Sequence, residues 1–97
     1  MSQPPSSQVS ILKAHFSGRV QGVGFRATVK QLAKGFEVTG HVRNLADGRV
    51  SVYAEGRRAE LEAFLAEIQG QMVGFIRTTD AEWSTGPRLS SQFAVIL

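Results

Sequence analysis

The chain has 97 residues, a hydrophobic share of 42%, a charged share of 20% and a formal net charge of +3 at pH 7, values typical of one globular domain. It has no cysteine, which excludes disulfides, thiolate metal ligands and a cysteine nucleophile and fits a reducing compartment. No apolar run approaches the roughly 18 residues of a membrane span, and the N-terminus lacks a signal-peptide core. We therefore expect a cytoplasmic protein with no membrane partner.

The basic residues are scattered singly or in pairs, and Arg57-Arg58 is the densest group. A mild positive charge can attract nucleic acid or a small anion, or simply keep the surface solvated. Because no stripe of five or six bases is present, we do not expect nucleic acid to be the partner.

The chain opens with a polar segment that contains two prolines, which predicts a disordered tail at 1–8 and a single domain at 9–97. From Val9 to Phe16 apolar and polar residues alternate, which indicates a half-buried strand. From Phe25 to Phe36 the apolar residues recur at steps of four, three, one and three, which predicts an amphipathic helix.

The remaining sequence predicts four more strands and one more helix. Asp47-Gly48 is typical of a hairpin turn between two of these strands. The second helix is marked by apolar residues at helical spacing and closes near Gly70. The strands are expected at about 38–43, 50–55, 76–84 and 93–97, and the helix is marked by Leu61, Phe64, Leu65 and Ile68.

The predicted order is β-α-β-β-α-β with a short extra C-terminal strand. This order is the split βαβ arrangement of the ferredoxin-like sandwich, an α+β fold. We expect two helices on one face of an antiparallel sheet. The fold by itself indicates no activity, because this scaffold carries many unrelated functions.

A glycine-rich loop connects the first predicted strand to the first predicted helix. Gly18, Gly22 and Gly24 fall within seven residues, and Arg26 follows on the first helical turn. Glycine permits unusual backbone angles and close approach of a ligand, while a helix start offers free N–H groups and a positive dipole end. An arginine adds a forked donor that matches two phosphate oxygens. The loop therefore predicts a site for a phosphate group.

Three longer motifs stand in fixed order, and they read Gly18-Arg19-Val20-Gln21-Gly22-Val23-Gly24-Phe25-Arg26, Gly40-His41-Val42-Arg43-Asn44 and Asp47-Gly48-Arg49-Val50. With these motifs, from about residue 16 to residue 56, the chain resembles the acylphosphatase family. The resemblance implies a ferredoxin-like enzyme that hydrolyses acyl phosphates to carboxylate and inorganic phosphate, with no metal or organic cofactor. A monomer is expected.

The resemblance also implies roles for particular residues. Arg26 is expected to bind the phosphate, and Asn44 is expected to orient the attacking water. Phosphoryl transfer needs mainly positioning and charge stabilisation, which such residues can supply. The backbone N–H groups that form the phosphate cradle are expected from Gln21, Gly22, Val23, Gly24 and Phe25.

Other functions fit parts of the sequence less well. The chain could be a small-anion or carbamoyl-phosphate module with little turnover, like the acylphosphatase-like domain of hydrogenase-maturation carbamoyltransferases. The cysteines and further domains of those proteins are absent here, so we expect a free-standing enzyme. RNA-recognition domains share the element order, but their stacking aromatics are missing. A nucleotide P-loop is excluded because Phe25-Arg26 stands where a lysine and a hydroxyl residue are needed.

Several residues are left with open roles. Arg19 could assist the cradle or lie in solvent, and His15 and His41 are expected on strands without metal-ligand partners nearby. The family commonly has a glycine where Glu37 stands, an aromatic at the position of His41 and a more polar C-terminal strand.

Overall fold

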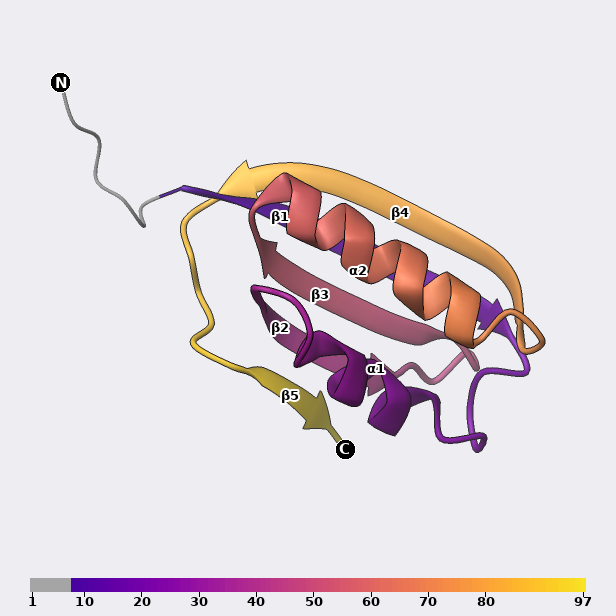
Figure 1. The fold of residues 1–97 in the computed structure, drawn as a ribbon. Coiled ribbons are helices and arrows are strands. Elements are labelled where there is room, and N and C mark those ends of the chain that lie inside the picture. The colour runs from indigo at the N-terminus through magenta and orange to yellow at the C-terminus, as the bar shows by residue number, and fades with distance from the viewer. Residues whose placement is uncertain (1–7) are drawn as a thin grey trace, which may run out of the picture.

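The computed structural model describes residues 8–97, so the tail predicted at 1–8 lies outside the described residues except for Gln8. Two helices and five strands follow in the predicted order (Figure 1). They are β1 (Val9–Gly18), α1 (Phe25–Ala33), β2 (Val38–Asn44), β3 (Val50–Gly56), α2 (Arg58–Gln71), β4 (Ile76–Gly86) and β5 (Phe93–Ile96).

The five strands form one sheet in the order β4-β1-β3-β2-β5, with both helices on the same face. β1 pairs antiparallel with β3 and β4, and β2 pairs antiparallel with β3. The expected ferredoxin-like fold is therefore confirmed.

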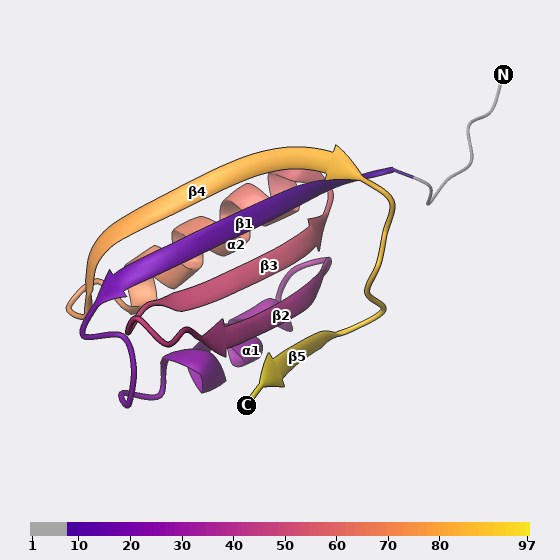
Figure 2. The same ribbon diagram turned by 180° about the vertical axis from the view of Figure 1, so that it is seen from behind.

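The expectation of a wholly antiparallel sheet is wrong at one edge, where β5 pairs parallel with β2. The connection 87–92 leaves the end of β4 and passes around one end of the sheet to the opposite edge (Figure 2). The chain thus enters β5 at the end where β2 begins, and the two strands run in the same direction.

The core lies between the helices and the sheet. Phe16 of β1 and Phe25 of α1 are buried with their ring centroids 5.3 Å apart. Phe64 of α2 is buried between Phe36 and Phe93, at centroid distances of 5.8 and 5.6 Å. Such aromatic pairs favour tilted or edge-to-face packing, as seen here. The last of these contacts ties β5 to the core.

The first helix ends at Ala33 rather than at Phe36 as predicted. The N–H groups of Lys34, Gly35 and Phe36 bond to carbonyls three residues earlier, at 3.2, 3.0 and 3.2 Å. This tighter turn ends the α-helix while keeping Phe36 on the apolar face. Among the described residues, no helix is both long enough and apolar enough to cross a membrane.

The sheet order determines where a site can form. β1 and β2 both run antiparallel to β3, which lies between them. Their last residues therefore lie at the same end of the sheet. The glycine loop that follows β1 and the connection that follows β2 therefore lie at one end of the molecule.

Candidate functional site

The glycine loop leads from β1 directly into the first turn of α1. Gly22 and Gly24 have φ angles of 78° and 80°, in the left-handed region that favours glycine. Gly24 is the N-cap residue, and its carbonyl accepts the first helical bond from Thr28 N at 3.0 Å. The N–H groups of residues 25–27 come before that bond and have no partner within the helix. The helix start thus presents unused donors.

A cavity of about 220 Å³ lies at this helix start. Pockets for drug-sized ligands span roughly 300–1,000 Å³, so this cavity suits a small group rather than a nucleotide. It brings together Arg26, Asn44 and three of the five residues predicted for the cradle. Its lining comprises Val20, Gly22, Gly24, Phe25, Arg26, Ala27, Asn44 and Val95.

Arg26 brings a positive charge to the cavity from the first turn of α1. Its Nη1 donates to the Ile96 carbonyl of β5 at 3.2 Å. Within residues 8–97 it forms no ion pair with a carboxylate, and the first turn contains no acidic residue. A cation beside the positive end of a helix is unfavourable unless an anion lies near both. The cavity is therefore electropositive and suited to an anion.

Asn44 is the last residue of β2 and contributes an amide to the cavity. Its Oδ1 is buried and has no hydrogen-bond partner among the described residues. Leaving a buried acceptor unpaired costs about 1–3 kcal/mol. A donor entering the cavity, such as water, would offset that cost.

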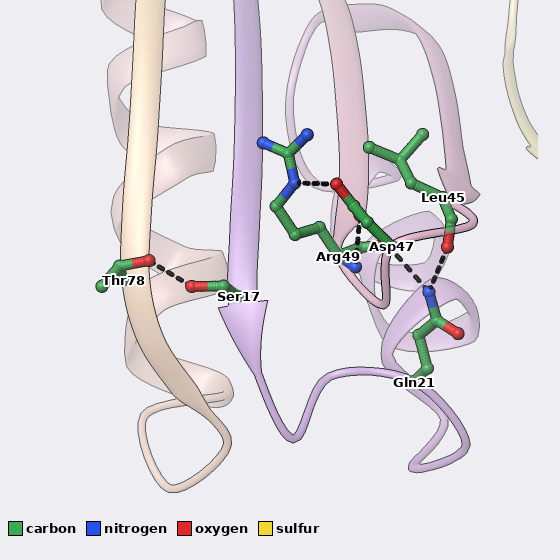
Figure 3. A network of polar contacts seen from close by, with 6 residues as sticks. All are labelled: Ser17, Gln21, Leu45, Asp47, Arg49 and Thr78. Carbon is green, nitrogen blue, oxygen red and sulfur yellow. Dashed lines mark hydrogen bonds and ion pairs between the residues drawn. The ribbon is translucent and has the colours of Figure 1, made fainter.

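Gln21 and Val23, the other two residues predicted for the cradle, do not line the cavity. Val23 is 38% exposed. The Gln21 side chain reaches the connection between β2 and β3, where its Nε2 donates to Leu45 O at 2.8 Å and to Arg49 O at 2.9 Å (Figure 3). The backbone roles expected for both residues stay predictions.

The connection 45–49 is closed by its own hydrogen bonds. Leu45 N donates to Arg49 O at 2.8 Å, and Gly48 N donates to Leu45 O at 3.1 Å. Asp47 accepts from the backbone N and the Nε of Arg49, at 3.1 and 2.9 Å (Figure 3). The Arg49 backbone N–H is the main cause that lowers the pKa of Asp47 below its ordinary value. The Asp-Gly turn was predicted, but this pairing was not.

The residues with open roles lie outside the cavity. Arg19 is exposed, and its backbone N donates to Phe75 O at 2.9 Å. His15 and His41 alternate with core residues and so point to the face of the sheet without helices. His41 stacks on Tyr53 with centroids 5.3 Å apart, and burial together with the charge of Arg43 lowers the pKa of His41.

Glu37 belongs to the surface at the other end of the sheet. Its carboxylate pairs with Arg57 at 2.8 Å, and its backbone N donates to Glu60 Oε1 at 2.7 Å. The charged residue that departs from the family pattern therefore links the start of β2 to the start of α2. Glu37 does not line the cavity.

Sequence reasoning missed the apolar part of the site. Val20, Ala27 and Val95 line the cavity, and the Ile96 carbonyl holds Arg26. The alternation at 93–97 indicated a strand but did not indicate which strand it pairs with. Only the parallel pairing with β2 places Val95 beside the glycine loop.

A buried carboxylate outside the cavity holds the segment that carries β5. Glu55 of β3 is fully buried and accepts four hydrogen bonds, from Tyr53 Oη (2.7 Å), Leu89 N (2.8 Å), Ser90 N (3.0 Å) and Thr39 Oγ1 (3.2 Å). Burial raises the pKa of Glu55, but these bonds together lower it below its ordinary value. Because Leu89 and Ser90 precede β5, the carboxylate fixes the connection 87–92.

Comparison with known proteins identifies relatives of this chain. The acylphosphatase family model matches residues 12–95. The acylphosphatase of Legionella pneumophila (strain Corby) is 50% identical over 58 residues, which are 60% of this chain and 64% of that protein. The acylphosphatase of Salinibacter ruber is 40% identical over 74 residues, which are 75% of this chain and 78% of that protein. The match thus spans slightly less than two thirds of the Legionella protein.

The fold is also that of a solved acylphosphatase. The structure of an acylphosphatase from Coxiella burnetii superimposes with a TM-score of 0.78 at 27% identity. The superposition covers 99% of this chain and 100% of that chain.

Proposed function

Because the chain belongs to the acylphosphatase family, we propose that it hydrolyses acyl phosphates, the mixed anhydrides of a carboxylic acid and phosphate. The observation that carries this proposal is the cavity that combines Arg26, the first-turn N–H groups of α1 and the unpaired Oδ1 of Asn44. A phosphoryl group needs the donors, and an attacking water needs the acceptor.

The cradle side binds and stabilises the phosphoryl group. The Arg26 guanidinium and the N–H groups of the helix start hold its oxygens, and they stay in place as charge moves toward the leaving carboxylate. Such groups are already oriented, so little reorganisation is needed during the reaction. Phosphoryl transfer asks for little covalent help from the protein, which fits a site with few reactive side chains.

Asn44 positions the nucleophile, which is a water molecule. Its Oδ1 accepts a hydrogen bond from a water and orients the water oxygen toward phosphorus, opposite the acyl oxygen. The new P–O bond forms as the bond between phosphorus and the acyl oxygen breaks. One water proton passes to a phosphate oxygen, and the products are a carboxylate and inorganic phosphate. Acyl phosphates are activated, so no strong general base is required.

The substrate is small and carries one phosphoryl group, in keeping with the cavity of about 220 Å³. We propose that the protein works as a cytoplasmic monomer, since one chain supplies all the residues described at the cavity. A carbamoyl-phosphate or anion-binding module and an RNA-binding domain are not favoured, because the relatives at 40–50% identity are acylphosphatases.

The test is phosphate release from a synthetic aroyl phosphate. Arg26→Ala and Asn44→Ala should each lower kcat/KM by about 10²–10³, the usual cost of losing one oriented donor or positioning group. Arg19→Ala is the matched control, and this exposed arginine outside the cavity should change the rate by less than about twofold. Activity of Arg26→Ala close to that of the wild type would contradict the assignment.

A further inference from the structure

We propose that Gln21 is a positioning residue that sets the spacing between the phosphate cradle and Asn44. In this proposal the cradle is taken without Gln21 and with Arg26, as residues 22–26. This inference rests on the proposed function, and it assigns to the Gln21 side chain a role separate from any contact of its backbone with phosphate.

The two halves of the cavity belong to pieces of chain that the sheet does not join directly. The cradle follows β1, whereas Asn44 ends β2, and β3 lies between these strands. The ladder hydrogen bonds of β1 and β2 both go to β3 on this side of the sheet. The distance across the cavity therefore depends on contacts made beyond the strand ends.

A single side-chain nitrogen of Gln21 joins the glycine loop to the connection 45–49. Its Nε2 lies 2.8 Å from Leu45 O and 2.9 Å from Arg49 O, at the two ends of the connection that begins next to Asn44 (Figure 3). An amide NH₂ has two donors, so it can serve both carbonyls at once. In residues 8–97, no other hydrogen bond joins the loop 19–24 to the connection 45–49.

The turn does not need Gln21 in order to close. Leu45 O already accepts from Gly48 N, and Arg49 O already accepts from Leu45 N. Gln21 adds a second donor to each carbonyl, so its contribution is to attach the loop to a turn that is formed independently. The residues just after it, Gly22 to Gly24, are exposed and have no such attachment.

This placement predicts a separation between binding and turnover. Under the proposed function, inorganic phosphate binds through Arg26 and the helix-start N–H groups, and the residues that carry them line the cavity. Attack by water requires Asn44 at the correct distance as well. Loss of the Gln21 donor should therefore slow hydrolysis, which needs both the cradle and Asn44, more than it weakens phosphate binding, which needs only the cradle.

The experiment measures kcat with an aroyl phosphate and the Kd of inorganic phosphate for Gln21→Leu. We expect kcat to fall about 10- to 100-fold, since a shift near 1 Å in a reacting geometry has effects of this size. The phosphate Kd should rise less than about threefold, because the cradle moves as one piece. Gln71→Leu is the control, since Gln71 is exposed on α2 and, within residues 8–97, its side chain donates a hydrogen bond only to Glu67, at 3.5 Å. A rise in the phosphate Kd by the same factor as the fall in kcat would overturn the proposal.

A double-mutant cycle tests whether Gln21 acts through Asn44. If it does, Gln21→Leu should lower the residual kcat of Asn44→Ala by less than about threefold, because residues that act as a unit are not additive. The same 10- to 100-fold loss in both backgrounds would overturn the positioning role.

A conservative variant adds a pH readout. Glutamate in Gln21→Glu accepts hydrogen bonds when ionised but gains one O–H donor when protonated. Its kcat relative to the wild type should therefore rise as the pH falls through the carboxyl pKa, and a constant ratio would overturn the proposal.

A wild-type chain that hydrolyses no acyl phosphate would refute the proposed function alone. NMR would then decide the inference, because Gln21→Leu must shift the Asn44 side-chain amide signals more than Gln71→Leu does. Unshifted signals would overturn it.

Discussion

Replacing Glu55 with glutamine tests how β5 is held beside the cavity. Glu55 is fully buried on β3, and its carboxylate accepts two backbone N–H groups from the connection that leads to β5. Glutamine has the same shape, but its nitrogen cannot accept. One of the two oxygens is thereby replaced by a donor that faces other donors.

The expected loss of stability follows from the four hydrogen bonds that the Glu55 carboxylate accepts. Hydrogen bonds to a charged group contribute about 1.5–3 kcal/mol each, and roughly half of them are lost. Water can reach Leu89, which is exposed, and recovers part of the loss. We therefore expect Glu55→Gln to lower the free energy of unfolding by about 2–3 kcal/mol at pH 7. Activity should fall as well, because β5 carries Val95 and the Ile96 carbonyl that holds Arg26.

The pH dependence gives a second signature. The pKa of Glu55 is lowered in the folded chain from its ordinary value of 4.5. A lowered pKa stabilises the folded state above 4.5, and that stabilisation is lost as the pH falls through the folded value. The stability difference between the wild type and Glu55→Gln should therefore be largest at neutral pH and shrink below pH 4.5.

The assay is urea unfolding followed by circular dichroism from pH 7 down to pH 3, with equal m-values as the check on two-state behaviour. Glu62→Gln is the matched control, because its carboxylate forms an exposed i,i+4 pair with Arg58 and should matter by less than about 0.5 kcal/mol. A cost for Glu55→Gln no larger than that of Glu62→Gln, or one that stays constant with pH, would refute the reasoning.

Three further predictions concern the site and the core. Gly24→Ala should cost about 1–2 kcal/mol, because nothing obstructs the added methyl group and only the left-handed φ of 80° opposes it; urea unfolding measures this, and a neutral effect would contradict it. Inorganic phosphate at 100 times the Kd of the wild type should stabilise the wild type by about 2.7 kcal/mol, measured as a rise in Tm. Equal stabilisation of Arg26→Ala at the same phosphate concentration would show that phosphate binds elsewhere. Phe64→Ala should cost about 3–5 kcal/mol in thermal unfolding, since it removes a buried ring that contacts Phe36 and Phe93, and a cost below 1 kcal/mol would contradict this packing.

The folded chain differs from the sequence predictions at the end of α1 and in the pairing of β5. The helix predicted to Phe36 ends at Ala33, because the N–H groups of residues 34–36 bond to carbonyls three residues back instead of four, which apolar periodicity does not reveal. The last strand was foreseen, but its parallel pairing was not, since alternation reports a strand and not its neighbour. Glu55 follows the buried Ala54 in an alternating strand, so the sequence pattern places it on the opposite face, where Leu89 and Ser90 of the connection 87–92 bond to its carboxylate.

The local features of this protein could be predicted from its amino-acid sequence. Apolar periodicity indicated the order of the helices and strands, and the glycine loop with Arg26 indicated an anion site, because these signals depend on residues close together in the chain. The contacts between strands became visible in the folded chain: Asn44 lines the same cavity as Arg26, Val95 forms part of its wall, and Gln21 is attached to the connection 45–49. Those contacts follow from the sheet order, which brings together residues that are far apart in the sequence.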